Sequence, residues 1–127
     1  MIESKAGIIG FAVGDAMGVP LEFCMREKLM KNPTTEMKGY GSHDVPKGSW
    51  SDDTSMTLAT IDSISKNGKI VPSDIANNFI EWMRNAKYTP TEKVFDIGRT
   101  TLQALARCEL MVEKAEEAGG NGEMDNG

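Results

Sequence analysis

Two adjacent aspartates between hydroxyl side chains are the residues of this chain best suited to chemistry. Asp52 and Asp53 lie in the run from Trp50 to Met56, after a Gly-Ser turn and before an apolar helical pattern. We therefore expect them at a helix N-terminus, where backbone N–H groups favour negative charge. With Ser51 they offer hard oxygen ligands that suit Mg²⁺, Mn²⁺ or Ca²⁺ rather than zinc. Successive helical residues diverge by about 100°, so the two carboxylates can face two different ions. The alternative is an ordinary N-cap, because Ser and Asp are favoured capping residues.

Composition narrows the class of protein. The chain has 127 residues, a net charge of −5 and 39% hydrophobic residues, which suits one small domain with an aliphatic core. The acidic balance and the lack of a basic patch argue against nucleic-acid binding. The two cysteines, Cys24 and Cys108, lack metal-ligand spacing, so we expect free thiols and a cytoplasmic location. No apolar stretch is long enough to span a membrane.

The first third of the chain predicts two helices and a long loop. Residues 4–17 read as a buried helix whose glycines at 10, 14 and 18 form a bare ridge, which implies close packing or a ligand there. A short polar helix is expected over residues 26–31. Residues 32–49 form a loop of the length typical of a lid or a binding loop. The loop carries His43, the single histidine, which we interpret as a solvated surface residue rather than a ligand.

The remainder predicts helices only. One helix is expected over residues 53–65, ended by Asn67-Gly68, and another begins at Pro72 with Phe79 and Trp82 in the core. A fourth helix is expected from about residue 94, with Val94 and Ile97 on it, a bend at Gly98 and an exposed, charged extension over residues 109–117. Residues 118–127 read as a glycine-rich tail or an interrupted loop. No strand pattern is present, so we predict an all-α fold.

Three segments then carry a family resemblance. Residues 14–23 (Gly-Asp-Ala-Met-Gly-Val-Pro-Leu-Glu-Phe) and the run from Trp50 to Met56 closely resemble the ADP-ribosylglycohydrolase family. Residues 95–101 (Phe-Asp-Ile-Gly-Arg-Thr-Thr) look like a third family segment. The family includes dinitrogenase reductase-activating glycohydrolases and crystallin J-like proteins. The resemblance implies an orthogonal multi-helix bundle that hydrolyses the glycosidic bond between ADP-ribose and an acceptor with two Mg²⁺ or Mn²⁺ ions.

The same resemblance assigns roles to particular residues. Ser51, Asp52 and Asp53 match the first group of metal ligands, and Glu22 matches the acidic residue that closes onto the metal site. A carboxylate such as Glu22 can take a proton from water. Asp96 matches an acidic residue near the substrate ribose. Asp15 belongs to the Gly-Asp signature, and we expect it to hold the turn after the first helix.

The chain also departs from the family pattern. Family members are roughly twice this length and carry a second group of metal ligands, Asp-x-Asp-Thr, of which no copy follows Asp53 here. We therefore interpret residues 1–127 as the N-terminal portion of a single ADP-ribosylglycohydrolase domain. Exposed apolar surface would then favour a homo-oligomer or a complementing C-terminal chain. Two alternatives stay open: a non-catalytic module that binds ADP-ribose or a partner protein, and an unrelated helical interaction protein.

Overall fold

The computed structural model describes residues 2–119, and in this range the all-α prediction is confirmed. The helices, in chain order, are α1 (Ile2–Gly18), α2 (Arg26–Lys31), α3 (Asp52–Asn67), α4 (Pro72–Asn85) and α5 (Arg99–Leu110), with the short 3₁₀ helices η1 (Val19–Leu21) and η2 (Val112–Glu117). The described part of the chain contains no strand. None of its helices is long and apolar enough to cross a membrane.

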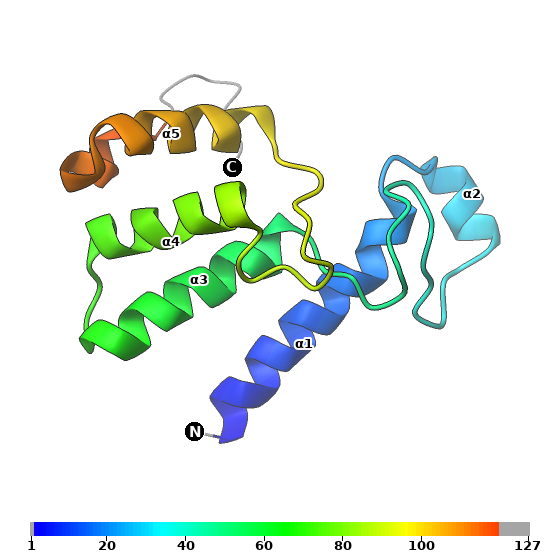
Figure 1. The fold of residues 1–127 in the computed structure, drawn as a ribbon. Helices are drawn as coiled ribbons and strands as arrows, with labels where there is room; N and C mark the ends of the chain where they lie inside the picture. The colour runs from blue at the N-terminus through cyan, green and yellow to red at the C-terminus, as the bar shows by residue number, and fades with distance from the viewer. Residues whose placement is uncertain (1, 120–127) are drawn as a thin grey trace.

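Helices α3, α4 and α5 form the packed part of the molecule, with α4 between the other two (Figure 1). Trp82 of α4 is 1% exposed, and Ala59 of α3 and Leu105 of α5 are also buried. Arg84 joins α4 to α5 through two hydrogen bonds to the Glu109 carboxylate, each 2.6 Å long. Helix α4, itself packed against α5, therefore holds α3 in place from one side.

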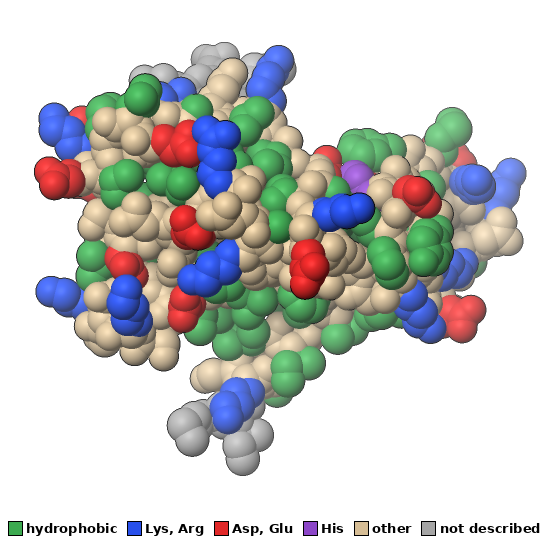
Figure 2. All heavy atoms as spheres, viewed as in Figure 1, with side chains coloured by type: hydrophobic (Ala, Val, Ile, Leu, Met, Phe, Trp, Pro, Cys, Tyr) green, Lys and Arg blue, Asp and Glu red, His purple; other side chains and the backbone are tan. Residues whose placement is uncertain are grey.

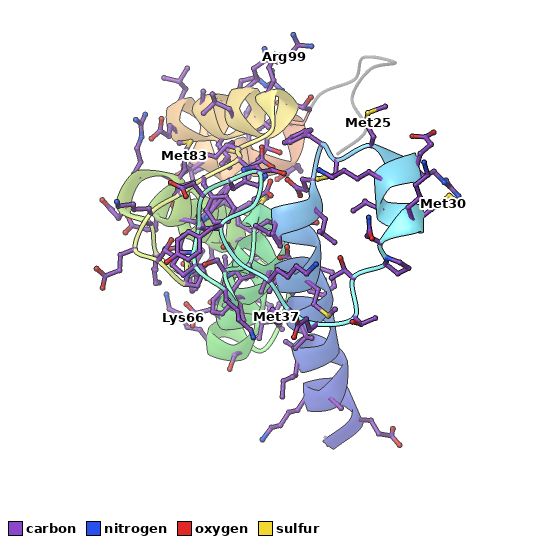
Figure 3. All side chains as sticks on the ribbon, turned by 90° about the vertical axis from the view of Figure 1, so that its right-hand side faces the viewer. Met25, Met30, Met37, Lys66, Met83 and Arg99 are labelled. Atoms are coloured by element: carbon purple, nitrogen blue, oxygen red, sulfur yellow. The ribbon has the colours of Figure 1, made fainter. Side chains whose placement is uncertain are left out.

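Local signals set the ends of α3 and α4 as expected. Gly68 follows α3 with a φ of +67° and donates its N–H to the carbonyl of Ile64, the left-handed termination that glycine favours. Pro72 occupies the first turn of α4, where its missing N–H costs nothing. The helix predicted over residues 26–31 is α2, with the same bounds, and Met30 of α2 and Met25, which directly precedes it, are both exposed (Figure 3).

The prediction that α1 is buried is wrong in this structure. Ile9 is 64% exposed, Phe11 47% and Val13 43%, and Figure 1 shows the N-terminal half of α1 projecting from the rest of the molecule. A Cβ added at Gly10 or at Gly14 would meet no atom within 4 Å. Only the C-terminal end of α1 is covered by the described residues, with Ala16 3% exposed, and the apolar side chains before it stay largely exposed.

The fourth predicted helix begins later than expected. Val94 and Ile97 lie in a connection that runs from residue 86 to residue 98, and α5 starts only at Arg99. Left-handed backbone at Glu92 and Asp96 (φ +55° at each) excludes a helix there. The extension over residues 109–117 is also wrong as one helix, because α5 ends at Leu110 and η2 is a separate turn. Of the predicted tail, residues 120–127 lie outside the described residues.

Candidate functional site

The N-terminus of α3 is built by a serine cap. Ser51 is buried, has extended backbone and accepts a hydrogen bond from the N–H of Asp53 through its hydroxyl (3.2 Å). The predicted cap is therefore present. Its presence does not exclude the metal interpretation, because a serine hydroxyl oxygen has two lone pairs and the cap uses one of them.

Asp15 supplies a second cap to the same helix. Its carboxylate accepts hydrogen bonds from the N–H of Ser51 (3.0 Å), the N–H of Thr54 (3.2 Å) and the hydroxyl of Thr54 (2.6 Å). These donors lie at the N-terminus of α3 and not in the turn after α1, so the expectation that Asp15 holds that turn is wrong. Instead, Asp15 ties α1 to α3 and satisfies backbone groups that would otherwise compete for the side chains of Asp52 and Asp53.

The aspartates that follow the cap repel each other. Asp52 is half-buried and Asp53 is exposed. Burial raises the pKa of Asp52, and the charges of Asp53 and Asp96 raise it further. Three carboxylates thus share one region of the surface, and a bound cation would relieve both the desolvation and the repulsion.

A second cluster joins three connecting segments. Glu22 follows η1, His43 lies in the connection between α2 and α3, and Asp96 lies in the connection before α5. Nε2 of His43 is hydrogen-bonded to Oε2 of Glu22 and lies 3.6 Å from Oδ2 of Asp96. One ligand atom from each residue lies within 4.8 Å of the other two, and neither Asp52 nor Asp53 belongs to this group. The charge of Asp96 is among the causes that raise the pKa of Asp52, so the two clusters lie within electrostatic reach of each other.

The interpretation of His43 as a solvated surface residue is therefore wrong. Its side chain is only 11% exposed, and the purple imidazole shows as a small area among other side chains in Figure 2. No local sequence signal marks this contact, because Glu22 and Asp96 are 21 and 53 residues away along the chain. The neighbouring Gly-Ser-His run, in a loop long enough to fold back on α1, is the only feature that could have suggested it.

A cavity of about 550 Å³ adjoins the second cluster. It is lined by residues 43–46 on one side and by residues in the range 90–95 on the other, including His43 and Phe95. This volume falls in the range of small-molecule sites. Of the three side chains of the cluster, that of His43 lines the cavity directly, and Phe95, the neighbour of Asp96, lines it as well.

The donor set fits a hard divalent cation in part. Ser51, Asp52 and Asp53 offer oxygen atoms at one helix end, and burial, followed by the charges of Asp53 and Asp96, raises the pKa of Asp52 there. A complete Mg²⁺ or Mn²⁺ shell needs about six oxygen ligands, of which waters can supply several. The described residues therefore fit such an ion as a partial shell.

Comparison with known proteins decides the family. The family model described as ADP-ribosylglycohydrolase matches residues 3–127. The chain belongs to the ADP-ribosylglycohydrolase family. ADP-ribosylarginine hydrolases of Serratia proteamaculans (strain 568) and Pseudomonas putida (strain GB-1) are each 36% identical to it over 103 residues, which is 81% of this chain and 27% of the relative.

A further ADP-ribosylglycohydrolase relative comes from Rhodospirillum rubrum. It is an ADP-ribosyl-dinitrogen reductase glycohydrolase, 29% identical over 107 residues, which cover 83% of this chain and 34% of the relative. The chain thus spans between 27% and 34% of the length of these three relatives. Family membership is established on this basis, whereas the activity, substrate and partners of the whole protein are matters for proposal.

Proposed function

We propose that the chain contributes the N-terminal part of a metal-dependent hydrolase that cleaves the glycosidic bond between ADP-ribose and an arginine side chain. The observation that carries the proposal is the meeting of Glu22 and Asp96 around His43, beside the carboxylates at the start of α3. Arginine is the proposed acceptor because two relatives are named ADP-ribosylarginine hydrolases. Residues 1–127 would then be one portion of a single domain.

Each carboxylate has a proposed role in this reaction. Glu22 takes a proton from the attacking water, whose oxygen forms a bond to C1″ of the ribose. The bond from C1″ to the guanidine nitrogen breaks, and the leaving nitrogen takes up the proton that Glu22 accepted from the water, which returns Glu22 to its carboxylate form. Asp96 stabilises the positive charge that develops at C1″.

Ser51, Asp52 and Asp53 are the proposed ligands of Mg²⁺ or Mn²⁺. Such ions, when bound, orient the ribose hydroxyls and polarise water. The hard oxygen donors at the helix end and the raised pKa of Asp52 support this assignment.

We further propose that a second chain segment covers α1. Ile9, Phe11 and Val13 are exposed on a helix whose glycines meet no neighbour. A complementing C-terminal chain or a second copy of this chain would bury them. The location proposed is the cytoplasm, since Cys24 and Cys108 are both free thiols.

The test is release of ADP-ribose from an ADP-ribosylated arginine peptide with Mg²⁺, with Mn²⁺ and with a chelator. It is run on this chain alone and on this chain with the matching downstream segment of a relative supplied in trans. Asp53→Asn should abolish metal-dependent release, while Asp62→Asn, an exposed aspartate on the same helix, should retain it. Metal-independent release, or none in either arrangement, would refute the proposal. Retained ADP-ribose binding without release would instead favour a binding module.

A further inference from the structure

Four side chains from the two segments that carry the catalytic candidates surround the imidazole of His43. Nε2 of the imidazole contacts the carboxylate of Glu22 and lies 3.6 Å from that of Asp96. The ring centroid is 5.8 Å from that of Phe23 at an interplanar angle of 62°, and 5.3 Å from that of Phe95 at 45°. Both distances are in the range of favourable aromatic pairs.

The side chains around His43 come in two pairs of adjacent residues, and we call these two pairs the clamp. Phe23 directly follows Glu22, and Phe95 directly precedes Asp96. Each segment therefore presents one carboxylate and one aromatic ring to the same imidazole. Phe23 and Asp96 both have left-handed backbone, with φ values of +60° and +55°. Such conformations are unfavourable for residues other than glycine, and they cluster where surrounding contacts impose them.

The loop that carries His43 is itself fixed against η1. The hydroxyl of Ser42 donates a hydrogen bond to the backbone carbonyl of Glu22. Gly41 lies so close to Pro20 that an added Cβ would be 2.0 Å from the Pro20 carbonyl oxygen. The N–H of Tyr40 closes the turn by donating to the carbonyl of Val45 over 2.8 Å. The imidazole is therefore placed by the backbone around it as well as by its own contacts.

We propose that His43 is a positioning residue that orients the carboxylate of Glu22 toward the reacting water through a hydrogen bond from Nε2. The proposal rests on the proposed hydrolase function and adds to it a residue with a defined role. The Nε2 donor fixes the side chain of Glu22 by its hydrogen bond, and the carboxylate of Asp96 lies near the same nitrogen, 3.6 Å away. A carboxylate that keeps one orientation needs no rearrangement when it accepts the proton of water.

The same three side chains also suit a transition metal, since imidazole and carboxylates are common ligands. The proposal favours the hydrogen bond because Nε2 already contacts Oε2 of Glu22 directly. Two variants separate these roles. His43→Gln keeps an N–H donor the same number of bonds from Cα but is a poor metal ligand, and His43→Leu removes the donor while keeping apolar bulk.

The first readout needs no activity. His43 is the only histidine, so the ring nitrogen signals in a long-range ¹H–¹⁵N spectrum belong to it alone. We expect the Nε2-protonated form, with an Nε2 resonance that moves on Glu22→Gln and stays in place on Glu27→Gln, an exposed glutamate on α2. A ring that is protonated at Nδ1 and whose nitrogen resonances do not change on Glu22→Gln would overturn the proposal, even if the protein is inactive.

The second readout is steady-state hydrolysis of the ADP-ribosylated arginine peptide by the active assembly. His43→Leu should lower kcat about 10- to 100-fold, the scale of a misplaced catalytic group, with KM within about threefold of wild type. His43→Gln should restore kcat to within about threefold of wild type. Equal losses of kcat in both variants would overturn the proposal in favour of a metal ligand. Wild-type rates in both variants would also overturn it, because His43 would then have no role in the reaction. An inactive wild type refutes the proposed function instead.

Discussion

The carboxylate of Asp15, near the end of α1, caps α3 by accepting hydrogen bonds from both the N–H and the hydroxyl of Thr54. The contact spans 39 residues of sequence and ends one residue after Asp53. Through this contact, α1, which carries the Gly-Asp signature, fixes the N-terminus of α3, where Asp52 and Asp53 lie. The signature residue thus acts on the candidate metal site through the backbone of α3.

Asp15→Ala should lower the free energy of unfolding by about 1–3 kcal/mol, the range for a lost cap that leaves buried N–H groups unpaired. The loss arises because the N–H groups of Ser51 and Thr54 lose their acceptor. Urea unfolding followed by circular dichroism measures it. Glu3→Ala, at an exposed position of the same helix, is the control. Equal stability of the two variants would show that the cap contributes nothing.

Added Mn²⁺ should stabilise the wild-type chain against heating, because an ion that binds only the folded state shifts the unfolding equilibrium. Asp52→Asn and Asp53→Asn should each reduce that shift, while Asp62→Asn should keep it. Chelator should return the wild type to its metal-free melting temperature. If Mn²⁺ leaves the melting temperature of the wild type and of every variant unchanged, Ser51, Asp52 and Asp53 serve only to cap α3.

Asp52→Asn should raise the stability of the metal-free chain at neutral pH. Burial, the charge of Asp53 and that of Asp96 raise the pKa of Asp52 above 3.8. A raised carboxyl pKa means that the folded state binds the proton more tightly, so stability is lost as pH rises through the folded pKa. The advantage of the variant should therefore shrink as pH falls toward 3.8. Urea unfolding in chelator across this range measures it, and an advantage that grows at low pH would contradict the assignment.

Charging the exposed face of α1 should reduce self-association. The paired change of Ile9→Lys and Phe11→Lys places two charges where two exposed apolar side chains now lie. Light scattering after size exclusion should then give a smaller mean mass than for wild type. Leu110→Lys, at an 88% exposed position on α5, is the matched control and should leave the mass unchanged. A wild-type chain that is already monomeric would exclude the second copy and leave only the complementing chain.

Local chemistry explains which parts of the fold were predictable. The cap at Ser51, the glycine at 68 and the proline at 72 act within a few residues of the helix ends they determine, so α3 and α4 could be located from sequence. The apolar residues Val94 and Ile97 have helical spacing, yet left-handed backbone at Glu92 and Asp96 excludes the helix. The spacing of apolar residues carries no information about such backbone conformations.

In the candidate site, too, the residues that could be proposed from sequence are those that lie close together along the chain. The metal ligands proposed at residues 51–53 are neighbours in sequence, so the family resemblance alone was enough to propose them. The contact of His43 with Glu22 and Asp96 depends on three connections meeting in space. The role of Asp15 was equally hidden, since a carboxylate on one helix can cap any helix end within its reach. Burial of α1 depends on what packs against it, and composition cannot reveal that.

The clamp around His43 also bears on the order in which the chain acquires its structure. Helices α3 and α4 are adjacent in sequence and can pair early, because short connections close at little entropic cost. The clamp closes only when residues 22, 43 and 96 meet, across separations of 21 and 53 residues. We therefore expect the cluster of Glu22, His43 and Asp96 to form after the helices that support it. During refolding, helical structure should then return before the histidine–glutamate contact does.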